Sequence, residues 1–153
     1  MEPENKPKTV DERYQILLVL WCALLFTQFV FLSMLFFMKN ELFRFEFTEP
    51  PGGKNPLLIL ILAAVSLTSF SLSFLLKFRM LRQAESEQDP NLVQTALILS
   101  CALCESISLF GFISGLALGY PYFFLWFALG IGGILLHFPK KAALLRATYK
   151  HEL

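Results

Sequence analysis

Charged residues are scarce in this sequence and are almost absent from four long stretches. They make up 16% of the 153 residues, whereas 56% of the residues are hydrophobic. This composition excludes an ordinary soluble domain of the same size. The sequence has no basic face for nucleic acid. It also lacks a phosphate loop, a dinucleotide fingerprint and a haem attachment motif, so we predict no cofactor.

Cysteine and histidine are also few, which limits metal and redox chemistry. The three cysteines, Cys22, Cys101 and Cys104, all fall inside apolar stretches. A Cys-x-x-Cys pair suggests redox chemistry in a soluble protein, but one turn apart on a membrane helix we interpret Cys101 and Cys104 as packing residues. No second group of Cys or His completes a metal site. We interpret His137, at the end of the last apolar stretch, as an interfacial residue without a function.

The apolar stretches predict an all-α membrane protein with four transmembrane helices in an up-down-up-down bundle. At about 1.5 Å per residue, the first three stretches cover a hydrocarbon core of about 30 Å, whereas the fourth is near the lower limit of length. The predicted helices span residues 14–38, 57–76, 92–117 and 122–138.

The polar segments outside residues 14–138 are assigned to the cytoplasm. Ten Lys and Arg residues lie in the N-terminal arm (1–13), the second connection and the C-terminal tail (139–153), against three in the remaining connections. Because cytoplasmic segments carry the excess of Lys and Arg, both termini are expected there. The first apolar stretch is too long for a cleaved leader, so we predict an integral protein of the bacterial inner membrane.

The connections and the tail carry further patterns. The first connection alternates Phe43, Phe45 and Phe47 with polar residues, which predicts an extended interfacial segment. The second, residues 77–91, reads as a solvated turn. The tail has apolar residues at Ala142, Leu145 and Tyr149, which predicts a short amphipathic segment on the inner leaflet.

Glu105 is the most informative residue, because it is a single carboxylate in the middle of the third apolar stretch. A charged side chain at the bilayer centre costs about 2.5 to 3.5 kcal/mol on insertion scales, so it faces a partner or water, or it is protonated. Ser108, one turn further, and Gln28 in the first stretch are candidates to form a proton-binding or ion-binding site with it. A packing role for Gln28 is the alternative.

Small residues mark the expected helix contacts. Glycines spaced by four residues allow close helix approach, and a stripe of serines at helical spacing is typical of a packed face or the wall of a cavity. These packing residues are Gly111, Gly115, Gly119, Gly130, Gly133, Ser66, Ser69 and Ser73.

Residues 82–112 resemble the polar loop and proton-binding helix of subunit c, the proteolipid of rotary ATP synthases. The matching residues are Arg82 and Pro90 in the loop, Ala102 to Glu105 as Ala-Leu-Cys-Glu, and the trio Leu109-Phe110-Gly111. The resemblance implies reversible protonation of Glu105. The sequence departs from the family in having six extra residues between Arg82 and Pro90 and no second copy of the hairpin.

Two functions follow from these residues. The first is an interaction or assembly component, which would bind the bilayer and form a homo-oligomer or join a larger membrane complex through its glycine faces. The alternative is binding or translocation of a proton or cation through Glu105. An enzyme is not predicted, because no nucleophile and base are spaced to assemble a catalytic site.

Overall fold

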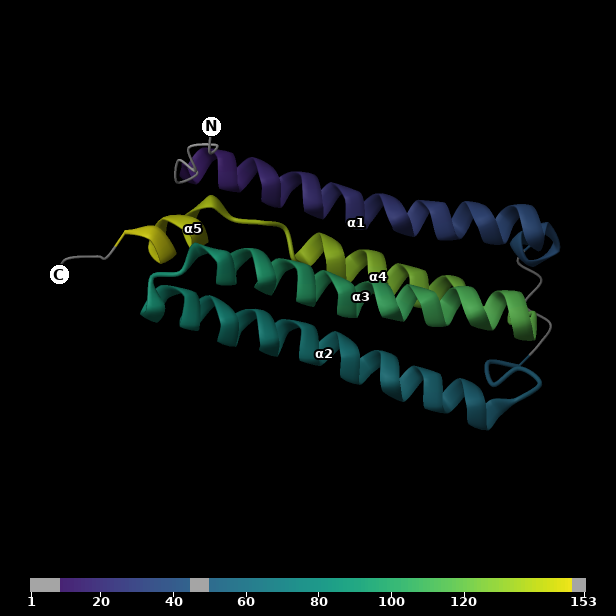
Figure 1. Cartoon of the computed structure of the whole chain (residues 1–153). Coiled ribbons are helices and arrows are strands. Elements are labelled where there is room, and N and C mark those ends of the chain that lie inside the picture. Colours follow the sequence, from purple (N-terminus) through teal and green to yellow (C-terminus); the bar gives the residue numbers. More distant parts are fainter. Residues whose placement is uncertain (1–8, 45–49, 150–153) are drawn as a thin grey trace, which may run out of the picture.

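A computed structural model describes residues 9–44 and 50–149, and within them the chain is built from helices and turns without a strand (Figure 1). The all-α class is therefore confirmed. The elements are α1 (Val10–Met38), η1 (Asn40–Arg44), α2 (Pro56–Glu87), α3 (Pro90–Leu118), α4 (Phe124–Leu136) and α5 (Lys141–Thr148). Three of them, α1, α2 and α3, are long and apolar enough to cross a membrane.

The helix α3 occupies the centre of the bundle, with α1 on one side and α2 on the other (Figure 1). In the most apolar 18 residues of each helix, 44% are buried in α3, compared with 11% in α1 and 17% in α2. The outer helices therefore present most of their apolar side chains outward, as helices do when lipid surrounds them.

The helix α1 begins four residues before the predicted start, because Thr9 caps it. The Thr9 side chain accepts a hydrogen bond from the Glu12 N–H, and the Glu12 carboxylate accepts one from the Thr9 N–H. This reciprocal pair is a capping box, which satisfies N–H groups that have no partner within the helix. The segment 1–8 of the predicted arm lies outside the described residues.

The connection predicted as a solvated turn is largely helical. The helix α2 continues through Glu87, and the turn consists of Gln88 in the left-handed region (φ 53°) and Asp89, which caps α3. Residues 77–87 contain no Gly or Pro and are rich in strong helix formers, so nothing ends the helix earlier. The buried Ala84 then packs against α3 and α5.

The extended segment predicted for the first connection is wrong where the structure describes it. Residues Asn40–Arg44 form the 3-10 helix η1, and Phe43 packs against Phe36 and Phe123 with ring centroids 5.2 and 5.1 Å apart. Aromatic packing at the end of the bundle therefore outweighs the alternating pattern. Phe45 and Phe47 lie outside the described residues.

The predicted fourth helix is shorter than expected and is followed by a break. The 13 residues of α4 are about 20 Å long at 1.5 Å per residue, less than a bilayer core of about 30 Å. After Leu136 the chain turns through Pro139 into α5, at an angle of 47° to α4. The two helices together pass the test for a fourth span, as one broken crossing.

The short helix α5 packs against the bundle with a different face from the predicted one. Leu144 and Ala147 are buried, whereas Ala142, Leu145 and Tyr149 are exposed. The two buried residues join the cluster formed by the start of α1, the end of α2 and the start of α3. The tail is thus part of the fold and still has apolar side chains facing outward.

Hydrogen bonds tie the two ends of the bundle. At one end, Arg13 of α1 donates to the Asn91 side chain at the start of α3 (2.9 Å), and Gln88 donates to the Arg146 carbonyl of α5 (3.2 Å). At the other end, the Tyr120 hydroxyl donates to the Pro51 carbonyl (2.5 Å). The start of α1, the α2–α3 turn and α5 therefore share one end, which we call the basic end because Lys77, Arg79, Arg82, Lys140, Lys141 and Arg146 are near it.

Candidate functional site

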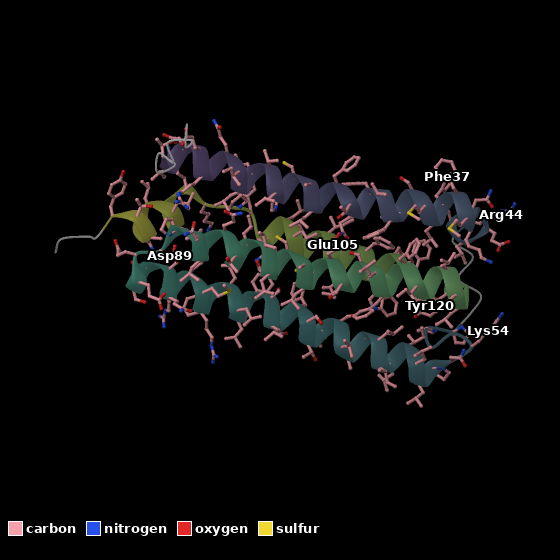
Figure 2. The ribbon with its side chains drawn as sticks, viewed as in Figure 1. Phe37, Arg44, Lys54, Asp89, Glu105 and Tyr120 are labelled. Carbon is pink, nitrogen blue, oxygen red and sulfur yellow. The ribbon has the colours of Figure 1, made fainter. Side chains whose placement is uncertain are left out.

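Glu105 lies halfway along α3 and is half-buried against α1. Figure 2 shows it between Asp89 at the basic end and Tyr120 and Lys54 at the other end. Its Oε1 atom is 2.5 Å from the hydroxyl oxygen of Thr27 on α1. In residues 9–44 and 50–149 no basic side chain forms an ion pair with Glu105. A hydroxyl, not a charge, is its partner.

The Thr27 hydroxyl has fewer hydrogens to donate than it has neighbouring acceptors. The Thr27 hydroxyl oxygen is 2.5 Å from the Glu105 carboxyl and 2.7 Å from the Leu24 carbonyl, yet a hydroxyl has one hydrogen to donate. If Thr27 donates to the Leu24 carbonyl, the hydrogen between Thr27 and Glu105 must come from the carboxyl. A protonated Glu105 therefore satisfies both short contacts, whereas a carboxylate satisfies only one of them.

Gln28 and Ser108, the other candidates for this site, do not bond to Glu105. Gln28 is fully buried, and neither its amide nitrogen nor its oxygen has a hydrogen-bond partner in the described structure. Ser108 is also buried with its hydroxyl unpartnered, and it faces Gly130 of α4. No hydrogen bond therefore joins the three predicted site residues, and the residue bonded to Glu105 is Thr27, which was not predicted.

A second buried polar cluster lies on the opposite side of α3, and the sequence did not indicate it. The His137 ring is fully buried at the end of α4, with Nε2 3.0 Å from the Ser73 hydroxyl of α2. The Cys104 thiol of α3 donates to the same hydroxyl (3.6 Å), and the His137 ring lies 4.4 Å from the Phe74 ring. The buried Nδ1 atom of His137 has no partner in the described structure.

This cluster surrounds the broken end of α4. The last carbonyls of a helix have no partner within the helix, so they need donors from elsewhere. Here the Trp21 indole of α1 donates to the Ile134 carbonyl (2.8 Å) and the Lys77 ammonium of α2 donates to the His137 carbonyl (3.0 Å). Side chains from two other helices therefore stabilise a helix end at the middle depth of the bundle.

The sequence missed this cluster because it placed His137 at the membrane surface. That placement assumed that residues 122–138 cross the whole bilayer. Pro139 was the available signal, because proline ends helices and the chain after it is charged. Only the packing of His137 beside Ser73 and Cys104 shows that α4 ends within the bundle.

Two of the three predicted serines of α2 bond to α4 or to the residue that ends it. The Ser66 hydroxyl accepts a hydrogen bond from the Trp126 indole (2.9 Å), Ser73 contacts His137, and Ser69 is half-buried. Polar groups on adjacent helices are thus paired across the α2–α4 interface.

The predicted packing glycines lie at helix contacts within the chain, except for one. A Cβ atom at Gly111 would lie 2.7 Å from Trp126, one at Gly115 2.9 Å from Leu35, and one at Gly133 2.5 Å from the Cys104 sulfur. A Cβ at Gly130 would overlap Ser108. Gly119 instead ends α3 with a φ of 60° and has open space around it.

Neither polar cluster has the ligands of a metal centre. In the described ranges no group of three or more His, Cys, Asp or Glu residues comes together. The Glu105 carboxyl is hydrogen-bonded to a hydroxyl, and the His137 ring is hydrogen-bonded to Ser73 through Nε2, while its Nδ1 atom has no partner in the described structure.

Comparison of the chain with family models, with curated proteins and with solved structures gave no match. Any function assigned to it must therefore come from the geometry of its own residues.

Proposed function

We propose that this chain is a proton-binding membrane protein in which Glu105 carries the proton. The observation that supports it is the position of the Thr27 hydroxyl, which lies within bonding distance of both the Glu105 carboxyl and the Leu24 carbonyl. With one hydroxyl hydrogen for two acceptors, the neutral carboxyl fits the site better than the carboxylate. A neutral carboxyl also avoids the cost of an unpaired charge at membrane depth.

The proposed topology places this site near the bilayer centre. The helices α1, α2 and α3 would each cross once, and α4 with α5 would form a fourth, broken crossing in an up-down-up-down order. The basic end would face the cytoplasm of a bacterial cell, with both termini there, because ten of the thirteen Lys and Arg residues belong to that side. Glu105 is flanked by about 14 residues of α3 on each side, so it would lie midway across.

Reversible proton binding is the role that the resemblance of residues 82–112 to subunit c would imply. What supports the same role here is a single carboxyl near the middle of α3 that is bonded to a neutral hydroxyl. Unlike the carboxylate of an ion pair, this carboxyl would take up a proton without leaving a cation unpaired. Exchange of the proton with a neighbouring carrier would then be the step that such a protein contributes.

An assembly role is the second candidate. The outward face of α1 exposes Phe26, Phe29, Phe36 and Phe37, which either lipid or a partner helix would cover. The glycine faces are already occupied inside the chain, so a partner would bind this aromatic face and not the glycines.

Infrared spectroscopy of the purified protein in lipid at pH 7 tests the proton at Glu105 directly. A protonated carboxyl has a C=O stretching band that is separate from that of a carboxylate. Exposed carboxyls are ionised at this pH, so a protonated band marks an unusual group. We expect the band in the wild type, its loss in Glu105→Gln, and its retention in Glu85→Gln, which removes an exposed carboxyl from α2.

Variants of the hydroxyl partner identify the contact. Thr27→Val has the same shape without the hydroxyl, whereas Thr27→Ser keeps the hydroxyl. We expect Thr27→Val to shift the frequency of the band and Thr27→Ser to leave it close to the wild-type position. A wild-type spectrum without a protonated band, or a band that survives in Glu105→Gln, would overturn the proposal.

A further inference from the structure

A cavity of about 180 Å³ lies beside the break between α4 and α5, and nothing in the proposed proton site uses it. Its walls come from α1, α2, α3 and the break itself. The lining residues include Leu17, Lys77, Val93, Leu97, Pro139 and Lys140. The cavity is partly open to its surroundings, so a group from outside the bundle can enter it.

The two lysines at this cavity have no acidic partner. The Lys77 ammonium uses one hydrogen on the His137 carbonyl, and a lysine has three to donate. Lys140 forms no ion pair in the described part of the chain, whereas the next residue, Lys141, is paired with Asp11. Two basic side chains therefore line one cavity with apolar walls, and no acidic side chain of the described residues pairs with either of them.

The position of the cavity indicates which anion would fill it. The cavity lies between the middle of the bundle and the basic end: Lys77 bonds to the His137 carbonyl on its deep side, the exposed Lys140 precedes α5, and the walls of Leu17, Val93 and Leu97 are apolar. A free anion would meet those apolar walls unfavourably. A phospholipid offers a negative phosphate for the lysines and methylene groups for the walls, and basic pockets between membrane helices bind anionic headgroups.

We infer that this cavity is a binding site for an anionic phospholipid, with Lys77 and Lys140 contacting its phosphate. The bound lipid would also cover the break in α4, because Leu136, Phe138 and Pro139 form one wall. Neither Thr27 nor Glu105 lines the cavity, so the site does not depend on proton binding.

Thermal unfolding of the full chain in a mild detergent tests the inference. Phosphatidylglycerol is added in steps, and phosphatidylcholine with the same acyl chains, which is zwitterionic and has no net charge, is the comparison. We expect phosphatidylglycerol to raise the Tm of the wild type in a saturable way and phosphatidylcholine to raise it far less. Sodium phosphate added without lipid is expected to have no effect.

Charge variants test the two lysines. Lys77→Gln combined with Lys140→Gln should weaken phosphatidylglycerol binding about 30-fold, which is about 2 kcal/mol for two basic residues near the headgroups. The matched control is Arg79→Gln combined with Arg82→Gln, which removes two exposed charges from the same end of α2 and leaves the cavity intact. The control should bind like the wild type.

Lys140→Gln alone serves if the double lysine variant does not fold, since Lys140 is exposed and bonds to no other described side chain. It should weaken binding about fivefold. Three results would each overturn the inference: equal stabilisation by phosphatidylcholine, equal stabilisation by sodium phosphate alone, and an equal loss of binding in the arginine control. If infrared spectroscopy found no protonated carboxyl at Glu105, the proposed function would fail, but the lipid-binding test would still decide this inference.

Discussion

Substitution of Gly130 tests how closely α4 packs against α3. A Cβ atom added there would overlap the Ser108 hydroxyl and would lie 2.8 Å from the Cys104 carbonyl, so α4 would have to move away from α3. Overpacking of this kind costs about 1 to 3 kcal/mol. Since alanine favours a helix over glycine by up to about 1 kcal/mol, we expect a net loss of about 1 to 2 kcal/mol in Gly130→Ala.

Gly132 is a matched control in the same helix. A Cβ atom there would have no neighbour within 4 Å, so Gly132→Ala keeps the gain in helix propensity without the overlap. We expect it to be as stable as the wild type or slightly more stable. Reversible unfolding in mixed micelles of increasing SDS content gives the free energy of unfolding of each variant.

A double variant identifies the atoms that cause the loss. Ser108→Ala removes the hydroxyl that a Cβ at Gly130 would overlap, but it leaves the Cys104 carbonyl in place. Gly130→Ala combined with Ser108→Ala should therefore lose less stability than the two single changes added together. Equal stability of Gly130→Ala and Gly132→Ala would refute the close α3–α4 contact.

Two further predictions concern single hydrogen bonds. Trp21→Phe removes the donor to the Ile134 carbonyl and should lower the free energy of unfolding in SDS by about 1 kcal/mol; unchanged stability would contradict that bond. Burial raises the pKa of Tyr120 above its ordinary value of about 10, so its neutral hydroxyl, bonded to the Pro51 carbonyl, contributes stability below that pH. This contribution is lost as the pH rises through the raised pKa, so the stability of the wild type should fall above about pH 10 more steeply than that of Tyr120→Phe, measured by unfolding at stepwise pH.

The sequence predicted the helices well where hydropathy alone decides them. The apolar stretches predicted both ends of α1 and α3 and the start of α2 to within four residues. The continuation of α2 to Glu87 was missed, because charged residues were taken as a sign of a turn. A helix end is set by breakers and caps, and this segment has none before Gln88.

The candidate site was predictable only in part, because the sequence does not fix the rotation of α1. The single carboxyl at Glu105 is visible in the sequence, but its partner is not, because Thr27 and Gln28 are adjacent and only the rotation of α1 decides which one faces α3. Successive residues on a helix point about 100° apart. Hydropathy has no information on that rotation, since nearly every residue around Thr27 is apolar.

The rotation of α3 about its own axis links the packing glycines to the Glu105 site. Cys104 and Glu105 are successive residues of α3, and they face opposite partners, Ser73 on one side and Thr27 on the other. The angle at which α3 presents Glu105 to Thr27 is therefore fixed on the far side, where Gly133 allows Cys104 to approach α4. The variant Gly130→Ala, which pushes α4 away from α3, should therefore change the infrared band of Glu105, although neither Gly130 nor Gly133 contacts that carboxyl. We therefore expect the packing of small residues to influence where the carboxyl points, which would join the two features that the sequence presented as separate.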